Sequence, residues 1–444
     1  MNRGEGTETY YDTSGLRLHA RGIVLYRTIG GDAPGWHLDL GQESVSLAPT
    51  PGLTSVPHDL RWLVTAFTRR ADLEPVVRRE NAPRPNGGET RVTLTSLRDG
   101  KSRHWDERHP TPRAEAIARV LGPRRHRSHR ALTGRDLALR YLRTEVAALP
   151  FEDCAVRREL PGAVARLHET AQRIRLVLKQ CAPLTGGRKL TRTIRAELRW
   201  VLSALAPFVD DEAQRVRLRR RLDEVSGDFE TGDAGVVLDE YFTARAEENR
   251  AEVVDVLDST RYLNLLHALD VLVVVLEEEP ERERPRIARL PAEAAFRSLL
   301  ATASQAVGRR LGELADAEER DTRSAAAQRA LNAVQRYDCL LAVSGRRGPA
   351  REWRQLLEAH RAAVLAMWHF DALARAAEEK SLSSSVFGVL RRFEADAADR
   401  CATDLAWRWR EGTFSSVLNG FEGRLSPSPV ANGRGEAAPA PLTV

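Results

Sequence analysis

The chain has 444 residues, 42% of them hydrophobic, so it is long enough to bury more than one core and to form two or three domains. Its four cysteines lack any CxxC spacing, which argues against a zinc knuckle or a redox pair, and no apolar run is long enough to span a bilayer. The formal net charge is +6, and residues 101–230 hold 28 Lys and Arg against 17 Asp and Glu. This local excess suggests a polyanionic partner, although an Arg-rich coding bias would also raise the number of cations.

The first hundred residues have a strand-like pattern. Alternating runs such as "GIVLYRTI" and "RVTLTSL", with frequent Gly and Pro, predict a β-rich domain over residues 1–110. The start of the chain has no apolar segment typical of a secretory signal, so we expect a cytoplasmic protein.

Residues 111–135 belong to a stretch that is rich in histidine and arginine. His104, His109, His126 and His129 gather there among eight arginines. Because arginine repels a metal cation, we expect a basic connector in this segment and neither a metal nor another cofactor in the protein.

From about Arg113 onward the apolar spacing becomes helical, which predicts an all-α body. The charged, Pro-interrupted run at residues 277–286 predicts a linker between two half-bundles, at residues 136–276 and 287–424. The tail at residues 425–444 is rich in Pro, Ala, Gly and Ser and is predicted to be disordered.

Two consecutive predicted helices carry rows of basic residues. In "ARLHETAQRIRLVLK" the side chains of His168, Arg175 and Lys179 share one face, opposite an apolar stripe. The next helix repeats the pattern with a second row, made of Arg188, Arg192, Arg195 and Arg199. Because a short turn joins the helices, antiparallel packing would bring the rows together into a groove of guanidinium groups for phosphate. The alternative is two solvated helix faces.

The order of the motifs resembles a CYTH domain followed by a CHAD domain, the conserved-histidine α-helical domain. "YYDTSGLRLHARGIVLYRTIGGDAPGWHLDL" is similar to the opening of bacterial CYTH domains that precede CHAD domains. "DLALRYLRTEVAAL", "RAELRWVLSALAPFVDD" and "LDSTRYLNLLHALD" follow in the family's order. The resemblance implies a mainly α fold: a CHAD-like bundle of two similar half-bundles behind a small, incomplete, β-rich CYTH-like domain. It also implies binding of inorganic polyphosphate.

The family's first-helix pattern, roughly HxxRxxxRRxR, is only partly kept. Arg173 and Arg175 match it, whereas Ala165, His168 and Gln172 depart from it. In the second half, Arg336 is retained and His360 matches a family histidine, whereas other positions differ: Gln328, Leu331, Gln335, Asp338 and Ala362. The resemblance therefore places the polyphosphate site mainly in the first half, with these expected residues: His168, Arg173, Arg175, Lys179, Arg188, Arg192, Arg195, Arg199, Arg336 and His360.

Catalytic CYTH domains hold a triphosphate in a β-tunnel, with an ExExK strand for the metal ions. The chain begins at Met1 without that strand, and Tyr26, Thr28 and Asp39 replace basic residues of the family. A shift of one residue would keep Arg27. We therefore expect no catalytic residues in this domain and favour polyphosphate binding without catalysis.

Two other functions stay open at this stage: a scaffold for a protein partner and, less favoured, a metal-dependent triphosphatase. Nucleic acid would bind only non-specifically, and association with polyphosphate granules is an option for a polymer-binding protein.

Overall fold

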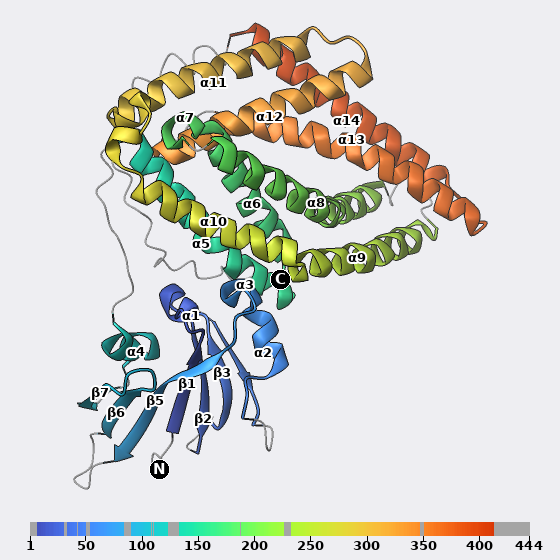
Figure 1. Ribbon diagram of the computed structural model, residues 1–444. Helices are drawn as coiled ribbons and strands as arrows, with labels where there is room; N and C mark the ends of the chain where they lie inside the picture. The colour runs from blue at the N-terminus through green and yellow to red at the C-terminus, as the bar shows by residue number, and fades with distance from the viewer. Residues whose placement is uncertain are drawn as a thin grey trace.

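The computed structural model describes residues 7–412, except 31–32, 42, 50–53, 84–89, 108, 110, 123–132, 187, 226–231 and 347–349. A sheet region (residues 7–122) lies below a larger helical region (residues 133–412), as Figure 1 shows. The fold is mainly α behind a β-rich start, as predicted from the sequence. The predicted tail at 425–444, and His126 and His129 of the connector, lie outside the described residues.

The sheet region contains one antiparallel sheet with strand order β4-β3-β2-β1-β5-β6-β7. The strands are β1 (Thr7–Asp12), β2 (Val24–Ile29), β3 (Gly35–Asp39), β4 (Ser44–Leu47), β5 (Glu74–Pro83), β6 (Thr90–Ser96) and β7 (Ser102–Glu107). One apolar face packs against α4 (Arg113–Leu121). The other packs against three short helices, α1 (Arg17–Arg21), α2 (His58–Leu63) and α3 (Thr65–Thr68).

The register of β2 decides on which face Arg27 lies. Tyr10 of β1 pairs with Tyr26, and the neighbouring residue Thr9 pairs with Arg27. The Arg27 guanidinium lies 5.7 Å from the centre of the Trp36 ring, on the face that packs against α1 to α3. Because side chains alternate across a strand, Arg27 points away from the face that carries Tyr26. Whether Arg27 takes the place of a basic residue of the family stays a prediction.

The helical region is built from ten α-helices in the described residues. Their bounds are α5 (Gly134–Arg157), α6 (Ala163–Gln180), α7 (Ala182–Thr185), α8 (Arg188–Val225), α9 (Ala234–Asp258), α10 (Thr260–Glu278), α11 (Ala292–Ala315), α12 (Arg320–Ser344), α13 (Ala350–Glu379) and α14 (Ser385–Arg410). Two 3-10 turns, Glu281–Glu283 and Arg286–Arg289, join α10 to α11.

One hydrophobic core extends across the predicted linker at 277–286. It joins residues of α5, α6, α8 and α10 to residues of α11 and α12, with Leu276 and Ala295 both buried in it. A separate cluster lies where α8 and α9 pack against α13 and α14. The predicted boundaries between half-bundles stay a prediction, but the two sides of the linker share apolar contacts.

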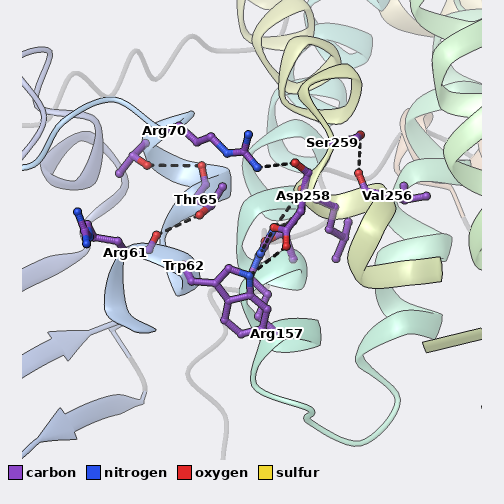
Figure 2. Close-up of polar contacts among 11 residues, drawn as sticks. Arg61, Trp62, Thr65, Arg70, Arg157, Val256, Asp258 and Ser259 are labelled. Atoms are coloured by element: carbon purple, nitrogen blue, oxygen red, sulfur yellow. Dashed lines mark hydrogen bonds and ion pairs between the residues drawn. The ribbon is translucent and has the colours of Figure 1, made fainter. Parts of the chain in front are cut away.

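The sheet region and the helical region are joined by a polar network, drawn in Figure 2. Asp258, at the end of α9, accepts hydrogen bonds from Trp62 Nε1 at 3.3 Å and from Arg157 Nη1 at 2.6 Å. Arg70 donates to the main-chain oxygen of Asp258. Arg157 also pairs with Asp153 at 2.6 Å, and both side chains are almost fully buried.

Among the described helices, none alone is long and apolar enough to cross a membrane. Only α9 and α10 taken together meet that criterion, with a bend of 54° between them.

Candidate functional site

A cluster of five basic side chains lies where α6, α8 and α12 meet. Both α8 and α12 pack against α6. We call this set the basic cluster; it consists of Arg175 and Lys179 from α6, Arg195 and Arg199 from α8, and Arg336 from α12. Burial and then the charges of Arg199, Arg336 and Arg195 lower the pKa of Arg175. Burial and the other four cations likewise lower the pKa of Lys179. The two rows predicted from the sequence therefore approach one another.

The apolar stripes of the two helices explain why the cationic rows point outward. Ile174 and Leu178 of α6, and Ile194 and Leu198 of α8, are buried in the core. On a helix, an apolar stripe that faces the core leaves the opposite side chains toward the surface. Lys179 and Arg199 are accordingly exposed, while Arg175, Arg195 and Arg336 are half-buried.

The basic cluster is not neutralised by carboxylates. In the described part of the chain none of its five side chains forms an ion pair, and Arg175 Nε donates only to Gln172 Oε1, at 3.1 Å. Arg173, two residues before Arg175, is different. It pairs with Glu145 at 2.9 Å and with Glu169 at 3.2 Å. Arg173 was expected at the site, but its charge is already balanced.

A small hollow between α11 and α12 extends the positive surface. It encloses about 130 Å³ and is lined by Ala306, Arg309, Arg310, Arg329, Asn332, Ala333 and Arg336. Glu313 pairs with Arg310 at 2.7 Å and with Arg329 at 3.5 Å. Arg336 belongs to both the hollow and the basic cluster, so the positive surface continues into the second half of the helical region.

Arg309 and Arg329 were missed in the sequence. Two positions where the family has basic residues hold Leu331 and Asp338. Leu331 is buried in the core. Asp338 lies 3.7 Å from Arg354 and forms an ion pair with it. The available signal was the seven-residue spacing between Arg329 and Arg336, which places both on one face of α12.

Among the predicted site residues whose side chains the structure describes, His168, Arg192 and His360 are not among the charges that lower the pKa of Arg175 or Lys179. Arg192 is exposed on α8, and the side chain of Arg188 lies outside the described residues. His168 is near Asp210 and Arg361, and burial lowers its pKa. His360 on α13 is only 4% exposed, its pKa is lowered by burial, and the charges near it are those of Asp399 and Arg323. Thus His360 is a core residue in this structure.

A second polar cluster lies on the Tyr26 face of the sheet. Arg113 of α4 donates to Glu8 Oε1 at 2.8 Å, and its guanidinium lies 4.4 Å from the centre of the Tyr26 ring. Burial alone would raise the pKa of Glu8. The hydrogen bond and the charge of Arg113 act in the opposite direction, and the pKa lies below its usual value. Arg79 and Glu107 form a buried ion pair at 3.0 Å. Acids and bases therefore balance one another on this face.

Within the described residues, no three His, Cys, Asp or Glu side chains lie together in a way that could hold a metal ion.

Part of the helical region is similar to a known family of domains. The family model of the CHAD domain matches residues 140–359. Two curated proteins of Mycobacterium tuberculosis are 25% identical to the chain over 456 residues, which cover 89% of the chain and 87% of each protein. They are the uncharacterized protein MT2285 of strain CDC 1551 / Oshkosh and the uncharacterized protein Rv2226 of strain ATCC 25618 / H37Rv.

Two solved structures are similar to parts of the chain. PptA from Streptomyces chartreusis has 22% identity and a TM-score of 0.49, covering 63% of this chain and 100% of that chain. The CHAD domain from the plant Ricinus communis has 14% identity and a TM-score of 0.49, covering 66% of this chain and 93% of that chain.

Proposed function

We propose that this chain, whose residues 140–359 form a CHAD domain, binds inorganic polyphosphate without cleaving it. The observation that carries the proposal is the basic cluster, five cations from three helices without a carboxylate partner in the described residues. Cations held this close repel one another, and a bound polyanion would remove that repulsion.

The chemistry of the cluster suits a repeating phosphate chain. Arginine presents a planar set of donors that can bond two phosphate oxygens at once, and four of the five cations are arginines. Residues four apart on a helix are separated by about 6 Å along the axis, so each row offers cations at regular intervals. Contacts of this kind hold a polymer in place without reading a base sequence, so nucleic acid would bind non-specifically.

The test compares two double variants with the same loss of charge. Arg195→Gln with Arg199→Gln removes two cations from the basic cluster, and Gln keeps the helix because it is a good helix former. The control is Arg375→Gln with Arg392→Gln, two exposed arginines with no ion pair among the described residues. They lie near the turn between α13 and α14, at the right of Figure 1 and away from α7.

Calorimetric titration with polyphosphate is expected to show a loss of affinity on the order of tenfold or more in the cluster variant. The control should bind almost as the unmodified chain does. Equal losses in both variants would mean that net charge alone explains binding. Release of phosphate from the polymer during the titration would contradict the non-catalytic part of the proposal.

A further inference from the structure

A second cavity lies between the sheet region and the helical region, apart from the basic cluster. It has a volume of about 400 Å³ and is formed by α1, the end of α3, α5 and α10. Its lining residues are Arg17, Ala20, Arg21, Phe67, Arg69, Pro150, His267, Asp270, Val271, Val274 and Val275. This volume is near the lower end of the range for small-molecule sites.

One end of the cavity is positively charged. Arg21 and Arg69 both donate to the carboxylate of Asp270, at 3.0 Å and 2.9 Å. Arg17 donates to the main-chain oxygen of Thr68 at 2.9 Å. The cavity lining thus contains three guanidinium groups and one carboxylate, which leaves an excess of positive charge.

Arg69 has spare hydrogen-bonding capacity. Its side chain is 9% exposed, and its Nε and Nη1 atoms are buried without a hydrogen-bond partner in the described residues. Leaving a buried donor unpaired costs about 1–3 kcal/mol, and more for a charged group. These two atoms have almost no accessible surface, so a ligand in the cavity would meet Arg69 through its positive charge and not through these donors.

The backbone at Arg69 is held in a costly conformation. Arg69 and Arg70 are consecutive non-glycine residues with φ of 57° and 60°. The left-handed region costs such residues roughly 1–2 kcal/mol each. Strain of this kind persists where the surrounding structure fixes it, and it is frequent at ligand sites.

The other end of the cavity is apolar and open to solvent. Val271, Val274 and Val275 of α10 are 41%, 50% and 50% exposed. They follow Asp270 within about 8 Å along the helix axis, so the charged end and the apolar end lie side by side in one cavity.

We propose that this cavity binds a small amphipathic carboxylate, with its charged group beside Arg21 and Arg69 and its alkyl chain on the valines of α10. A purely polar anion would leave the valines in water, and a neutral alkane would leave the excess positive charge of the cavity lining without a counter-charge. An alkyl carboxylate satisfies both ends. The proposal is independent of polyphosphate binding, since it uses no residue of the basic cluster.

The test measures binding of octanoate to the full chain by calorimetry. Val274→Asp places a carboxylate at the apolar end and leaves the contacts of Arg69 unchanged, so octanoate affinity should fall by roughly tenfold or more. Arg69→Met should also weaken octanoate binding on the order of tenfold or more. The matched control is Val236→Asp on α9, because Val236 is similarly exposed, at 56%, and does not line the cavity.

Saturable octanoate binding that is weakened by Val274→Asp and Arg69→Met, but not by Val236→Asp, would support the proposal. No saturable binding to the unmodified chain would overturn it, as would equal weakening in the control. Octanol tests the charged end: binding of octanol as tight as that of octanoate would show that the ligand is not recognised as an anion.

Discussion

Arg336 of α12 lies close enough to Arg175 of α6 for its charge to lower the pKa of Arg175, in addition to the larger effect of burial. The two helices come from opposite sides of the run at 277–286, so the basic cluster is assembled only when the two halves pack together. Like charges held together in this way reduce stability, which is a common cost of a binding surface.

Replacing Arg336 by Gln should therefore stabilise the unliganded protein. The expected gain in the free energy of unfolding is a few tenths of a kcal/mol at low salt, and screening should remove it at high salt. Urea unfolding at two salt concentrations measures both effects, with Arg392→Gln as the control. A loss of stability at low salt, or a gain that does not depend on salt, would contradict the repulsion between Arg336 and Arg175.

A second prediction concerns Arg135, which is buried at the start of α5. It donates to the main-chain oxygens of Leu184 and Leu276, at 3.1 Å and 2.6 Å, and pairs with Glu279 at 2.7 Å. These contacts satisfy carbonyl groups at the ends of α7 and α10, which have no partner within their own helices.

Arg135→Met should lower the free energy of unfolding by roughly 3–5 kcal/mol, because it leaves Glu279 and the carbonyls without their donor. The comparison variant is Arg140→Met, an exposed position on the same helix, which should change stability by no more than about 0.5 kcal/mol. Urea unfolding measures the free energy of unfolding of both variants. Similar values would show that the contacts of Arg135 with the ends of α7 and α10 do not stabilise the fold.

The sequence predicted much of the site because both rows depend on local periodicity. Arg175 with Lys179, and Arg195 with Arg199, follow the helical repeat, and their opposite faces are apolar. Position in a helix could not reveal that Arg173 pairs with Glu145, which lies on α5. The second partner of Arg173, Glu169, lies four residues earlier on the same helix and follows the helical repeat, so only the contact with Glu145 depends on tertiary packing.

The cavity between the two regions could not be predicted for a different reason. A left-handed backbone conformation is usually predicted from a Gly or Asn at that position. Arg69 and Arg70 are neither, so the sequence gives no indication of their positive φ. The valines of α10 belong to an apolar run that, read alone, indicates core packing, yet Val274 and Val275 are half exposed. Their exposure depends on how the sheet region docks.

The dependence of stability on pH gives a third prediction. Burial lowers the pKa of His168, His360 and His369 below the ordinary value of 6.5. Just below that value the unfolded chain binds more protons than the folded one, so the free energy of unfolding rises with pH and falls on acidification. The melting temperature should therefore decrease between pH 7.5 and pH 5.5.

His360→Gln should reduce this decrease, whatever its effect on stability at pH 7.5, because one titrating group is removed. Thermal unfolding of the variant and of the unmodified chain at both pH values gives the comparison. An undiminished decrease in the variant would rule out a contribution from His360.

A fourth prediction concerns the docking of the sheet region. Asp258→Asn weakens the ion pair with Arg157, although Arg157 still pairs with Asp153. The substitution also replaces the carboxylate that accepts the hydrogen bond of Trp62 Nε1 by an amide (Figure 2). Backbone amides of α2 and α3 should then exchange hydrogen faster, since these helices face the interface. Asp255→Asn, an exposed neighbour on α9, serves as the control. Unchanged exchange in α2 and α3 would show that the apolar contacts alone hold the two regions together.

The last prediction separates contact with a polymer from a general effect of charge. Each phosphate neutralised by a cation releases a condensed counterion, so affinity should fall linearly with salt on a logarithmic scale. If Arg195 and Arg199 contact polyphosphate, replacing both by Gln should make this slope shallower by roughly one to two units. The Arg375→Gln, Arg392→Gln control changes net charge by the same amount but removes no contact, so its slope should match that of the unmodified chain. Equal slopes in all three proteins would mean that the row on α8 is a solvated helix face, because a side chain that touches no phosphate releases no counterion when the polymer binds.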